Sequence, residues 1–497
     1  MGTFSGYLLN ALSVIINVLS VPISLAYFGA VRFGAMAVAN SLLAYLSVTY
    51  FGIPNAVNVL AAKALDTTDQ LKVIIKSFLL IAMISALVLA AFIVMTLSPH
   101  WIDLLGKIPE GVYEEVRGAI FVSAILFIVN VPLSIFLHGF SARQKVHLLK
   151  TYNSVSSFLT FLSLLASVWL GGTLVYYAFL RGVAVILVNI VAAVHLLTSM
   201  GVSARNLVSN VSQFLTPSGN AEFSISSITR TSSRFFLVYL AGTIVWSTDN
   251  LVISHILGVE AVTPYTITFR LITMTYVMFS AFNEAISPAF SKTYSTGDYQ
   301  WIEKVYNKMI IILPVLGGLV WIGGVSFSRD IINLWVGPSG YGGLLMAFSI
   351  GGHGYLCAVN SAPVNLGNSL NHVFVSMAIA EAVANFLFSV LLIKYLGSGG
   401  VALGTFLGTL LTVFWISPLY IYRKMDKKIR FNYGPSIKHF FVILLPLLIC
   451  VLLVQSISLM VETRVALNLS FVCIYLFLSY VLFKKDVNEV FVYLKNK

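Results

Sequence analysis

Residues 27–31 read YFGAV and residues 256–260 read ILGVE, so a glycine between apolar neighbours returns 229 residues later. A longer landmark behaves in the same way, because residues 98–106 (SPHWIDLLG) are answered by residues 328–337 (SRDIINLWVG). In a membrane protein, landmarks that recur at one spacing indicate two similar halves, as in transporters that move one half against the other. We therefore expect a transporter with an internal repeat.

The composition is that of an integral membrane protein. Hydrophobic residues make up 58% of the chain and charged residues 10%, whereas soluble domains are about one quarter charged. Stretches of about 20 apolar residues can cross a membrane, and they must be helical because lipid satisfies no backbone hydrogen bonds. The fourteen predicted spans are 6–28, 34–57, 74–97, 117–139, 152–171, 173–198, 233–255, 263–287, 308–327, 343–366, 373–396, 400–422, 438–460 and 465–483. We expect the first to be a retained helix and not a signal peptide, since it has no basic flank.

The repeat maps the first six spans onto the next six, and an even number of spans gives both halves the same orientation. The sequence therefore predicts an all-α polytopic membrane protein with about 14 transmembrane helices, in which two parallel six-helix lobes surround a central cavity. A two-helix hairpin follows them. The predicted parts are an N-lobe (1–199), a cytoplasmic linker between the lobes (200–232), a C-lobe (233–424), and a basic loop with the hairpin and a cytoplasmic tail (425–497).

The net charge of +12 reflects the distribution of basic residues among the loops. With the N-terminus inside, 22 of the 30 Lys and Arg residues lie in cytoplasmic segments and six in outer ones. The positive-inside rule therefore places both termini in the cytoplasm. This interpretation is favoured over nucleic-acid binding. Cys357, Cys450 and Cys473 lie in apolar stretches without metal-ligand spacing and are expected to be packing residues.

The sequence contains no glycine-rich phosphate loop with lysine, no metal-ligand cluster and no nucleophile triad. We therefore predict no catalytic residues, no metal and no cofactor. The longest outer loop, about 98–116, is also short for a membrane glycosyltransferase or polymerase. A transporter that is not an enzyme is the expected class.

Residues 248–265 (TDNLVISHILGVEAVTPY), 25–34 (LAYFGAVRFG) and 52–56 (GIPNA) resemble the O-antigen or capsule repeat-unit flippases of bacteria. These belong to the multidrug/oligosaccharidyl-lipid/polysaccharide exporter superfamily, and the resemblance covers roughly 6–424. It implies a flippase that moves an undecaprenyl-pyrophosphate-linked oligosaccharide from the cytoplasmic to the outer leaflet by alternating access. It also implies the bacterial inner (plasma) membrane, H⁺ or Na⁺ as coupling ion, and partners that can include a polysaccharide polymerase and chain-length proteins.

Two other functions of the same superfamily stay open. An ion-coupled multidrug exporter would favour an acidic lumen and twelve spans, which the predicted fourteen spans and two buried arginines disfavour. A peptidoglycan-precursor lipid flippase shares the number of fourteen spans. The motifs favour the superfamily and do not identify the sugar.

Basic residues within or beside the spans are candidates for binding the substrate, because charge in a membrane is costly unless it has a role. Arg181 and Arg270 lie inside predicted spans in different halves, and Arg32 lies in the short loop after the first span. Two guanidinium groups facing one cavity would suit a pyrophosphate through bidentate hydrogen bonds. The alternative is that each arginine pairs with a buried carboxylate and only holds helices together.

Three acids and one histidine complete the candidate residues. Asp249, Glu284 and Glu381 lie within predicted spans, where a carboxylate can carry an ion or proton through the transport cycle. An ion pair or a gating hydrogen bond is the alternative for each. His353 lies among Gly351, Gly352 and Gly354, where a ligand or a neighbouring helix can approach closely. We expect His353 either to contact the substrate or to fill packing space.

Overall fold

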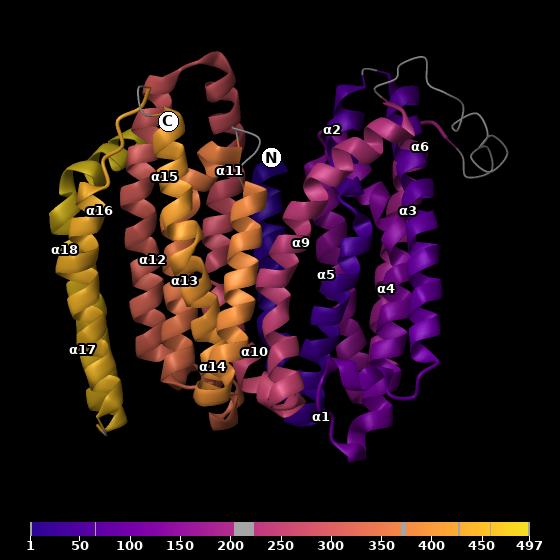
Figure 1. The fold of residues 1–497 in the computed structure, drawn as a ribbon, viewed down its shortest axis with the longest axis horizontal. Helices are drawn as coiled ribbons and strands as arrows, with labels where there is room; N and C mark the ends of the chain where they lie inside the picture. The colour runs from indigo at the N-terminus through magenta and orange to yellow at the C-terminus, as the bar shows by residue number, and fades with distance from the viewer. Residues whose placement is uncertain are drawn as a thin grey trace. The chain divides into compact units, whose positions relative to one another are not determined.

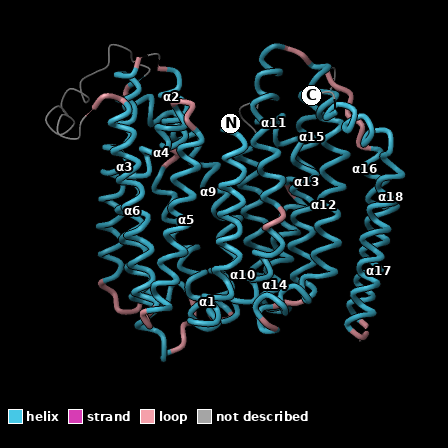
Figure 2. Tube along the Cα trace, turned by 180° about the vertical axis from the view of Figure 1, so that it is seen from behind, coloured by secondary structure: helices cyan, strands magenta, loops and turns pink. Residues whose placement is uncertain are grey.

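The computed structural model describes residues 2–64, 66–202, 223–368, 374–425, 428–457 and 459–495, and within these ranges the chain forms helices and no strands (Figure 1 and Figure 2). Nine helical segments in these ranges are long and apolar enough to cross a membrane. The predicted all-α polytopic membrane fold is therefore confirmed. Most of the predicted linker, 200–232, lies outside the described residues. The chain packs as two compact units, Met1–Thr263 and Pro264–Lys497, which are described separately below.

The first unit consists of long helices joined by short turns. In chain order its elements are α1 (Gly2–Leu46), η1 (Ser47–Tyr50), α2 (Ile53–Lys63), α3 (Thr67–Thr96), η2 (Trp101–Leu105), η3 (Glu110–Val112), α4 (Tyr113–Ala142), α5 (Val146–Trp169), α6 (Leu174–Ser199), α9 (Ile225–Ile256) and η5 (Val259–Ala261). Helix α4 packs on α3 and α6, and α1 packs on α5 and α9. The buried side chains between them are mainly Ile, Val, Leu, Phe and Ala, as expected for helices that pack within a bilayer.

Helix α1 contains two of the predicted spans, which meet at a turn of one residue. Gly29 has φ 76° and ψ 171°, a conformation that a side chain would make costly. Before the turn, α1 runs parallel to α5, because Ser13 Oγ lies 3.5 Å from Ser154 Oγ and the Tyr27 hydroxyl donates to Gly172 O at 3.1 Å. The predicted boundary between spans 6–28 and 34–57 therefore falls at Gly29.

After the turn, α1 runs antiparallel to α9. The Asn250 amide donates to Ser41 Oγ at 3.0 Å, and four residues further along α1 the Tyr45 hydroxyl is hydrogen-bonded to Thr248 Oγ1 at 2.5 Å. Residue numbers in α9 thus fall as those in α1 rise. This packing places the polar face of residues 40–45 against α9.

The second unit is also helical. Its elements are α10 (Val262–Thr273), which begins at the boundary, α11 (Tyr276–Thr296), α12 (Tyr299–Val336), η6 (Pro338–Gly340), α13 (Leu344–Asn368), α14 (Phe374–Leu411), α15 (Val413–Met425), α16 (Gly434–His439), the π-helical turn η7 (Phe440–Leu444), α17 (Leu445–Ser456) and α18 (Val461–Lys495). Helix α13 packs on α12, α14, α15 and α11. It is therefore the central helix of this unit.

Helix α14 reverses direction at Gly397, where φ is 59° and ψ is −147°. Its two halves pair in antiparallel register, since Asn385 Nδ2 donates to Thr405 Oγ1 at 3.0 Å and Ser389 Oγ donates to Val401 O at 3.3 Å. The predicted spans 373–396 and 400–422 are thus the two arms of one tight hairpin, of which the second continues into α15.

Glycines at every fourth position allow the arms of this hairpin to touch. A Cβ on Gly404 would lie 2.5 Å from Ser389 N, and a Cβ on Gly408 would lie 2.8 Å from Asn385 N. Small residues at this spacing let two membrane helices approach backbone to backbone. This close contact holds residue 409 opposite residue 381, which matters for the site below.

The predicted C-terminal hairpin corresponds to α16, η7, α17 and α18. Helices α17 and α18 lie side by side along α12, as the ribbon of Figure 1 and the Cα tube of Figure 2 show. The Tyr475 hydroxyl donates to Val315 O at 2.7 Å, and Asn468 Nδ2 donates to Ser326 O at 2.8 Å. The hairpin is therefore tied to α12 by polar contacts as well as by apolar packing.

Eleven of the fourteen predicted spans lie in the nine qualifying segments, because two segments contain a hairpin each. Spans 152–171 and 343–366 correspond to α5 and α13, and span 263–287 is divided into α10 and α11. Packing separates the units after Thr263, whereas the repeat predicts that the C-lobe begins at residue 233. The difference is α9, which packs on α1 and α2. The lobe boundaries stay a prediction from the repeat.

Candidate functional site

The first unit has a polar face on α1 that receives side chains from α6 and α9. The half-buried Arg181 of α6 donates from Nη1 to Asn40 Oδ1 at 2.9 Å. No carboxylate lies within ion-pair distance of this guanidinium among the described residues. Among the described residues, Arg181 is thus held by a neutral amide and not by a buried acid. A neutral amide leaves most of the donors of the guanidinium available for an anion.

Asp249 lies beside the same face of α1. Its neighbours in α9 bond to that face, since Asn250 donates to Ser41 and the Thr248 and Tyr45 hydroxyls are hydrogen-bonded to each other. The Asp249 side chain is 4% exposed. Two predicted residues, Arg181 of α6 and Asp249 of α9, thus lie on helices that both bond to the 40–45 segment of α1.

Arg32 has a different environment. Its Nε donates to Glu115 Oε2 at 2.7 Å, and Glu115 Oε1 accepts from the backbone N–H of Leu174 at 2.8 Å. Leu174 is the first residue of α6, so the carboxylate both neutralises Arg32 and satisfies an otherwise unpaired N–H of a helix start. In this conformation Arg32 joins α1, α4 and α6 structurally.

Arg270 lies in the last turn of α10, directly before the interruption at Met274 and Thr275 that separates α10 from α11. Its side chain is half-buried. Interrupted membrane helices often flank transport sites, because freed backbone groups and helix ends can meet a ligand there. Glu284 belongs to α11, and its side chain lies outside the described part of the structure.

In the second unit, His353 and Glu381 are joined through a residue that sequence reasoning did not select. Thr409 Oγ1 donates to Glu381 Oε1 at 2.6 Å and lies 3.0 Å from His353 Nδ1. On its other side, His353 Nε2 lies 3.6 Å from Cys357 Sγ. We call Cys357, His353, Thr409 and Glu381 the polar chain. His353 is 2% exposed, and its neighbours Gly351 and Gly352 let α13 pack closely on Trp321 of α12 and Phe406 of α14.

The bonding rules assign donors within the polar chain. Thr409 has one hydroxyl proton and two acceptors in reach, Glu381 Oε1 at 2.6 Å and Thr405 O at 3.2 Å; the shorter contact assigns the proton to the carboxylate. His353 must then donate from Nδ1 to the Thr409 oxygen, and the neutral ring accepts from the Cys357 thiol at Nε2. A carboxylate, a hydroxyl and an imidazole in contact form a path along which a proton can move.

A set of amides lies on α11 and α13 and was also missed by sequence reasoning. Asn365 Nδ2 donates to Asn283 Oδ1 at 2.8 Å, and Asn283 Nδ2 donates to Ser361 Oγ at 3.2 Å. Ser361 in turn donates to Cys357 O at 3.1 Å. This neutral set therefore continues the polar chain along α13.

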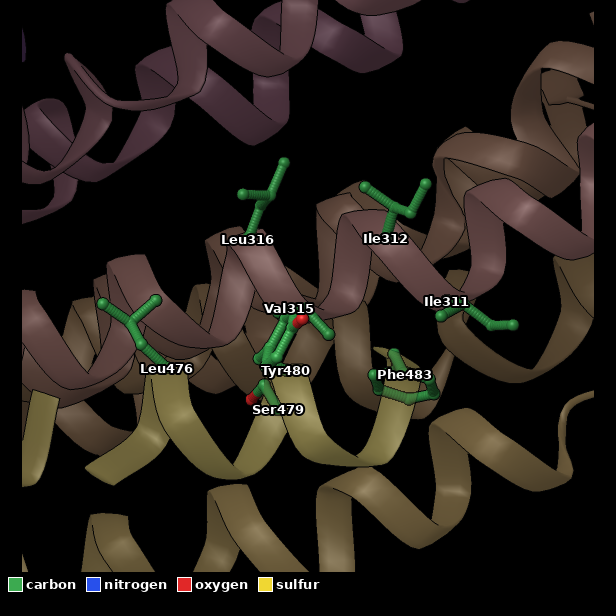
Figure 3. Close-up of a pocket in the computed structure, with 8 residues that line it drawn as sticks. All are labelled: Ile311, Ile312, Val315, Leu316, Leu476, Ser479, Tyr480 and Phe483. Carbon is green, nitrogen blue, oxygen red and sulfur yellow. The ribbon is translucent and has the colours of Figure 1, made fainter. Parts of the chain in front are cut away.

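An apolar groove of about 220 Å³ runs between α12 and α18 (Figure 3). Ile311, Ile312, Val315 and Leu316 line it from α12, and Leu476, Ser479, Tyr480 and Phe483 line it from α18. Figure 3 shows Leu316 and Ile312 projecting from α12 on the side away from α18. A groove with this lining suits a hydrocarbon chain and no charged group.

Among the described residues, no group of three or more His, Cys, Asp or Glu side chains could hold a metal ion. The cysteines form no disulfide: Cys357, Cys450 and Cys473 are free.

No protein-family model matches the chain. It is 28% identical over 212 residues to the protein of Salmonella typhimurium named "Putative O-antigen transporter". That segment covers 40% of this chain and 47% of the relative. The match thus spans about half of the length of the relative. It confirms the predicted resemblance to O-antigen flippases.

Solved structures with a similar fold include a flippase and a multidrug transporter. The lipid II flippase MurJ in an inward closed conformation superposes with a TM-score of 0.70 at 13% identity, over 97% of this chain and 99% of that protein. An inward-facing multidrug resistance MATE family transporter of the MOP superfamily gives 0.64 at 16% identity, over 83% of this chain and 94% of that protein. The chain therefore has the fold that MurJ shares with the MATE transporters of the MOP superfamily.

Proposed function

We propose that this protein is a flippase that moves a polyprenyl-pyrophosphate-linked oligosaccharide, such as an O-antigen or capsule repeat unit, from the cytoplasmic to the outer leaflet of a bacterial inner membrane. The observation that carries the proposal is Arg181, a guanidinium within a membrane span that bonds to a neutral amide. The MurJ-like fold and the O-antigen relative support the same class of substrate.

The chemistry of such a substrate explains why a cation is needed. A pyrophosphate cannot enter hydrocarbon, because burying an unpaired charge costs many kcal/mol. Arg181 offers planar, bidentate hydrogen bonds to phosphate oxygens, and Arg270 beside the helix interruption is the second candidate. Asn40 positions Arg181 without neutralising it.

The lipid part of the substrate requires a different surface. A polyprenyl tail can stay in the bilayer while the head group crosses, provided that the protein offers it an apolar path. The groove between α12 and α18 has the required lining (Figure 3). We assign it to a segment of the tail.

Transport against a gradient needs an energy source, and we propose that it is the proton gradient. The polar chain supplies a carboxylate at Glu381 and a relay through Thr409 to His353. Protonation of Glu381 would remove a buried charge and weaken the hydrogen bond that Glu381 accepts from Thr409. A proton-dependent contact between α13 and α14 could in this way favour one conformation over another. Asp249 is the matching candidate in the first unit.

The test uses a strain that lacks its own repeat-unit flippase and depends on this protein for surface polysaccharide. Arg181→Ala should reduce surface polysaccharide at least about tenfold, which corresponds to losing one charge-assisted contact of about 1.5–3 kcal/mol. Arg181→Lys keeps the charge and should retain part of the export. Asn40→Ala should have a smaller effect than Arg181→Ala.

Normal polysaccharide from the Arg181→Ala variant, at equal protein abundance in the membrane, would contradict the role of Arg181. Normal polysaccharide after deletion of the whole gene, in a strain with no second flippase, would contradict the flippase proposal itself. Both termini in the cytoplasm, and association with a polymerase and chain-length proteins, belong to the same proposal.

A second function, ion-coupled export of cationic drugs, is favoured by one observation: MATE transporters share the fold. The buried acids Asp249 and Glu381 would then bind the drug or the coupling ion. Drug susceptibility of a deletion strain distinguishes the two functions, because a flippase for lipid-linked sugars should leave it unchanged. Export of a peptidoglycan precursor would instead make the gene essential.

A further inference from the structure

A polar pocket of about 630 Å³ lies where α12 ends and α17 turns into α18. It is distant in sequence from the polar chain and from Arg181. Its volume is within the range of about 300–1,000 Å³ that is usual for small-ligand sites. The polar wall consists of Arg329, Asp330 and Asn333 from α12, Gln455 from α17 and Arg464 from α18.

The centre of this wall is an ion pair that leaves hydrogen-bonding groups unused. Arg464 Nη2 donates to Asp330 Oδ1. Arg464 is only 8% exposed, and both its Nε and the second carboxylate oxygen, Asp330 Oδ2, are buried without a hydrogen-bond partner in the described part of the chain. Unsatisfied groups of this kind are costly for both signs of charge. The Nε–H of Arg464 therefore has no acceptor, and Oδ2 of Asp330 has no donor, within the described part of the chain.

The surrounding wall adds a second cation. Arg329 is exposed at the pocket and precedes Asp330 in the chain. Gln455 holds the wall in place, since its Nε2 donates to Ser326 O at 3.0 Å. A ligand that fits this arrangement carries an anion for the two guanidinium groups and a cationic donor for the carboxylate.

The remaining wall is apolar and faces outward. Leu334 is 92% exposed, and Ile457 and Val461 are also mostly exposed. These residues stand at the ends of membrane-spanning segments, where polar head groups and acyl chains of lipids meet. A lipid can place its head group in the pocket while its chains lie against these side chains, which a soluble ligand cannot do.

We propose that this pocket binds the phosphoethanolamine head group of a phosphatidylethanolamine lipid. The phosphate is held by Arg329 and Arg464, and the ammonium donates to Asp330. Phosphatidylglycerol lacks a cation for Asp330, and phosphatidylcholine has a quaternary ammonium that cannot donate a hydrogen bond. Binding of an annular lipid in this form would link the appended hairpin to α12.

The experiment uses the full chain in phosphatidylcholine nanodiscs that contain equal small fractions of phosphatidylethanolamine and phosphatidylglycerol. Native mass spectrometry of the released protein counts the lipids that stay bound. We expect phosphatidylethanolamine to be retained about tenfold more than phosphatidylcholine, the effect of one charge-assisted hydrogen bond. Soluble phosphoethanolamine should compete weakly, because it lacks the acyl chains.

Three variants assign the retention to the pocket. Asp330→Asn should abolish the preference for phosphatidylethanolamine over phosphatidylcholine, and Arg329→Gln, on the exposed wall, should reduce retention of both. Glu462→Gln removes a carboxylate at the same end of α18 from an exposed position outside the pocket, and should change nothing. If Asp330→Asn does not fold, the lipid retention of Arg329→Gln decides whether the lipid binds in this pocket.

Equal retention of the three lipids would overturn the proposal. A preference for phosphatidylethanolamine that survives in Asp330→Asn, or a retention of both lipids that is unchanged in Arg329→Gln, would overturn the assignment to this pocket. Competition by soluble phosphoethanolamine that equals competition by the lipid would overturn the assignment to a lipid. These outcomes are independent of which substrate the protein transports.

Discussion

Ionisable residues in the membrane-spanning segments occupy distinct environments, and the environment decides what each can do. Arg32 is neutralised by Glu115, whereas Arg181 bonds to the amide of Asn40. Glu381 accepts from Thr409, and so belongs to a path that also contains His353. A charge that is already paired stabilises helices, and a charge held by neutral groups can still exchange its partner for a ligand or a proton.

Thr409 is the residue through which the proposed proton path is tested. Thr409→Val keeps the shape of this buried side chain but removes the hydroxyl, so His353 and Glu381 lose their common partner. We expect proton-driven transport in proteoliposomes to fall at least about tenfold, while Thr409→Ser, which restores the hydroxyl, stays near the wild-type rate. The cost of leaving buried partners unbonded, about 1–3 kcal/mol, should also lower the unfolding temperature.

Thr405→Val is the matched control, since Thr405 lies one turn earlier and bonds to Asn385 outside the polar chain. It should lower the unfolding temperature similarly and leave the proton-dependence of transport unchanged. If both variants lose transport equally, the role of Thr409 is structural.

Arg181 and Glu381 could be selected as candidates because a charge in an apolar span is conspicuous. His353 was selected because glycines flank it. Thr409 and Asn40 were not, because neutral hydroxyls and amides are common in membrane helices and carry no signal alone. Which of them converge depends on the rotation of each helix about its axis, and only packing against neighbours sets that rotation.

At the scale of elements, glycines explain both the successes and the limits of the sequence prediction. The repeated landmark glycines Gly29 and Gly258 both have positive φ with extended ψ, as do Gly106 and Gly337. The repeat therefore preserves backbone turns as well as residue types. Hydropathy located the spans, but it could not show that two pairs of them form hairpins with a one-residue turn, or that span 263–287 is interrupted at Met274 and Thr275.

The hairpin of α14 makes a prediction about stability. In Gly404→Ala the new Cβ would lie 2.5 Å from Ser389 N, so the two arms must separate and the contacts that align Thr409 with Glu381 weaken. We expect a loss of about 1–3 kcal/mol, typical of overpacking. Thermal unfolding in detergent measures it.

Gly323→Ala provides the comparison, because a Cβ at this position of α12 would lie in open space, with no neighbouring heavy atom within 4 Å. Alanine favours a helix over glycine by up to about 1 kcal/mol, so this variant should be equal to or more stable than the wild type. Equal behaviour of the two variants would show that the arms of the hairpin are not in tight contact.

For the molecule as a whole, charge predicts the orientation in the membrane. The predicted topology assigns 22 Lys and Arg residues to cytoplasmic segments and six to outer ones, so the positive-inside rule predicts that both termini lie in the cytoplasm. The direction of transport, the side on which Arg181 meets a substrate and the leaflet that supplies the lipid for the α12–α18 pocket all depend on this orientation.

Cysteine labelling in intact spheroplasts tests the predicted orientation directly. In a background where Cys357, Cys450 and Cys473 are replaced by alanine, Ser98→Cys and Lys424→Cys place single thiols at exposed positions in segments predicted to lie on opposite sides. A membrane-impermeant maleimide should label the cysteine at position 98 in intact spheroplasts and the one at position 424 only after the membrane is opened. The reverse pattern would invert the topology and with it the proposed direction of transport, whereas labelling of both from outside would contradict the odd number of predicted spans between them.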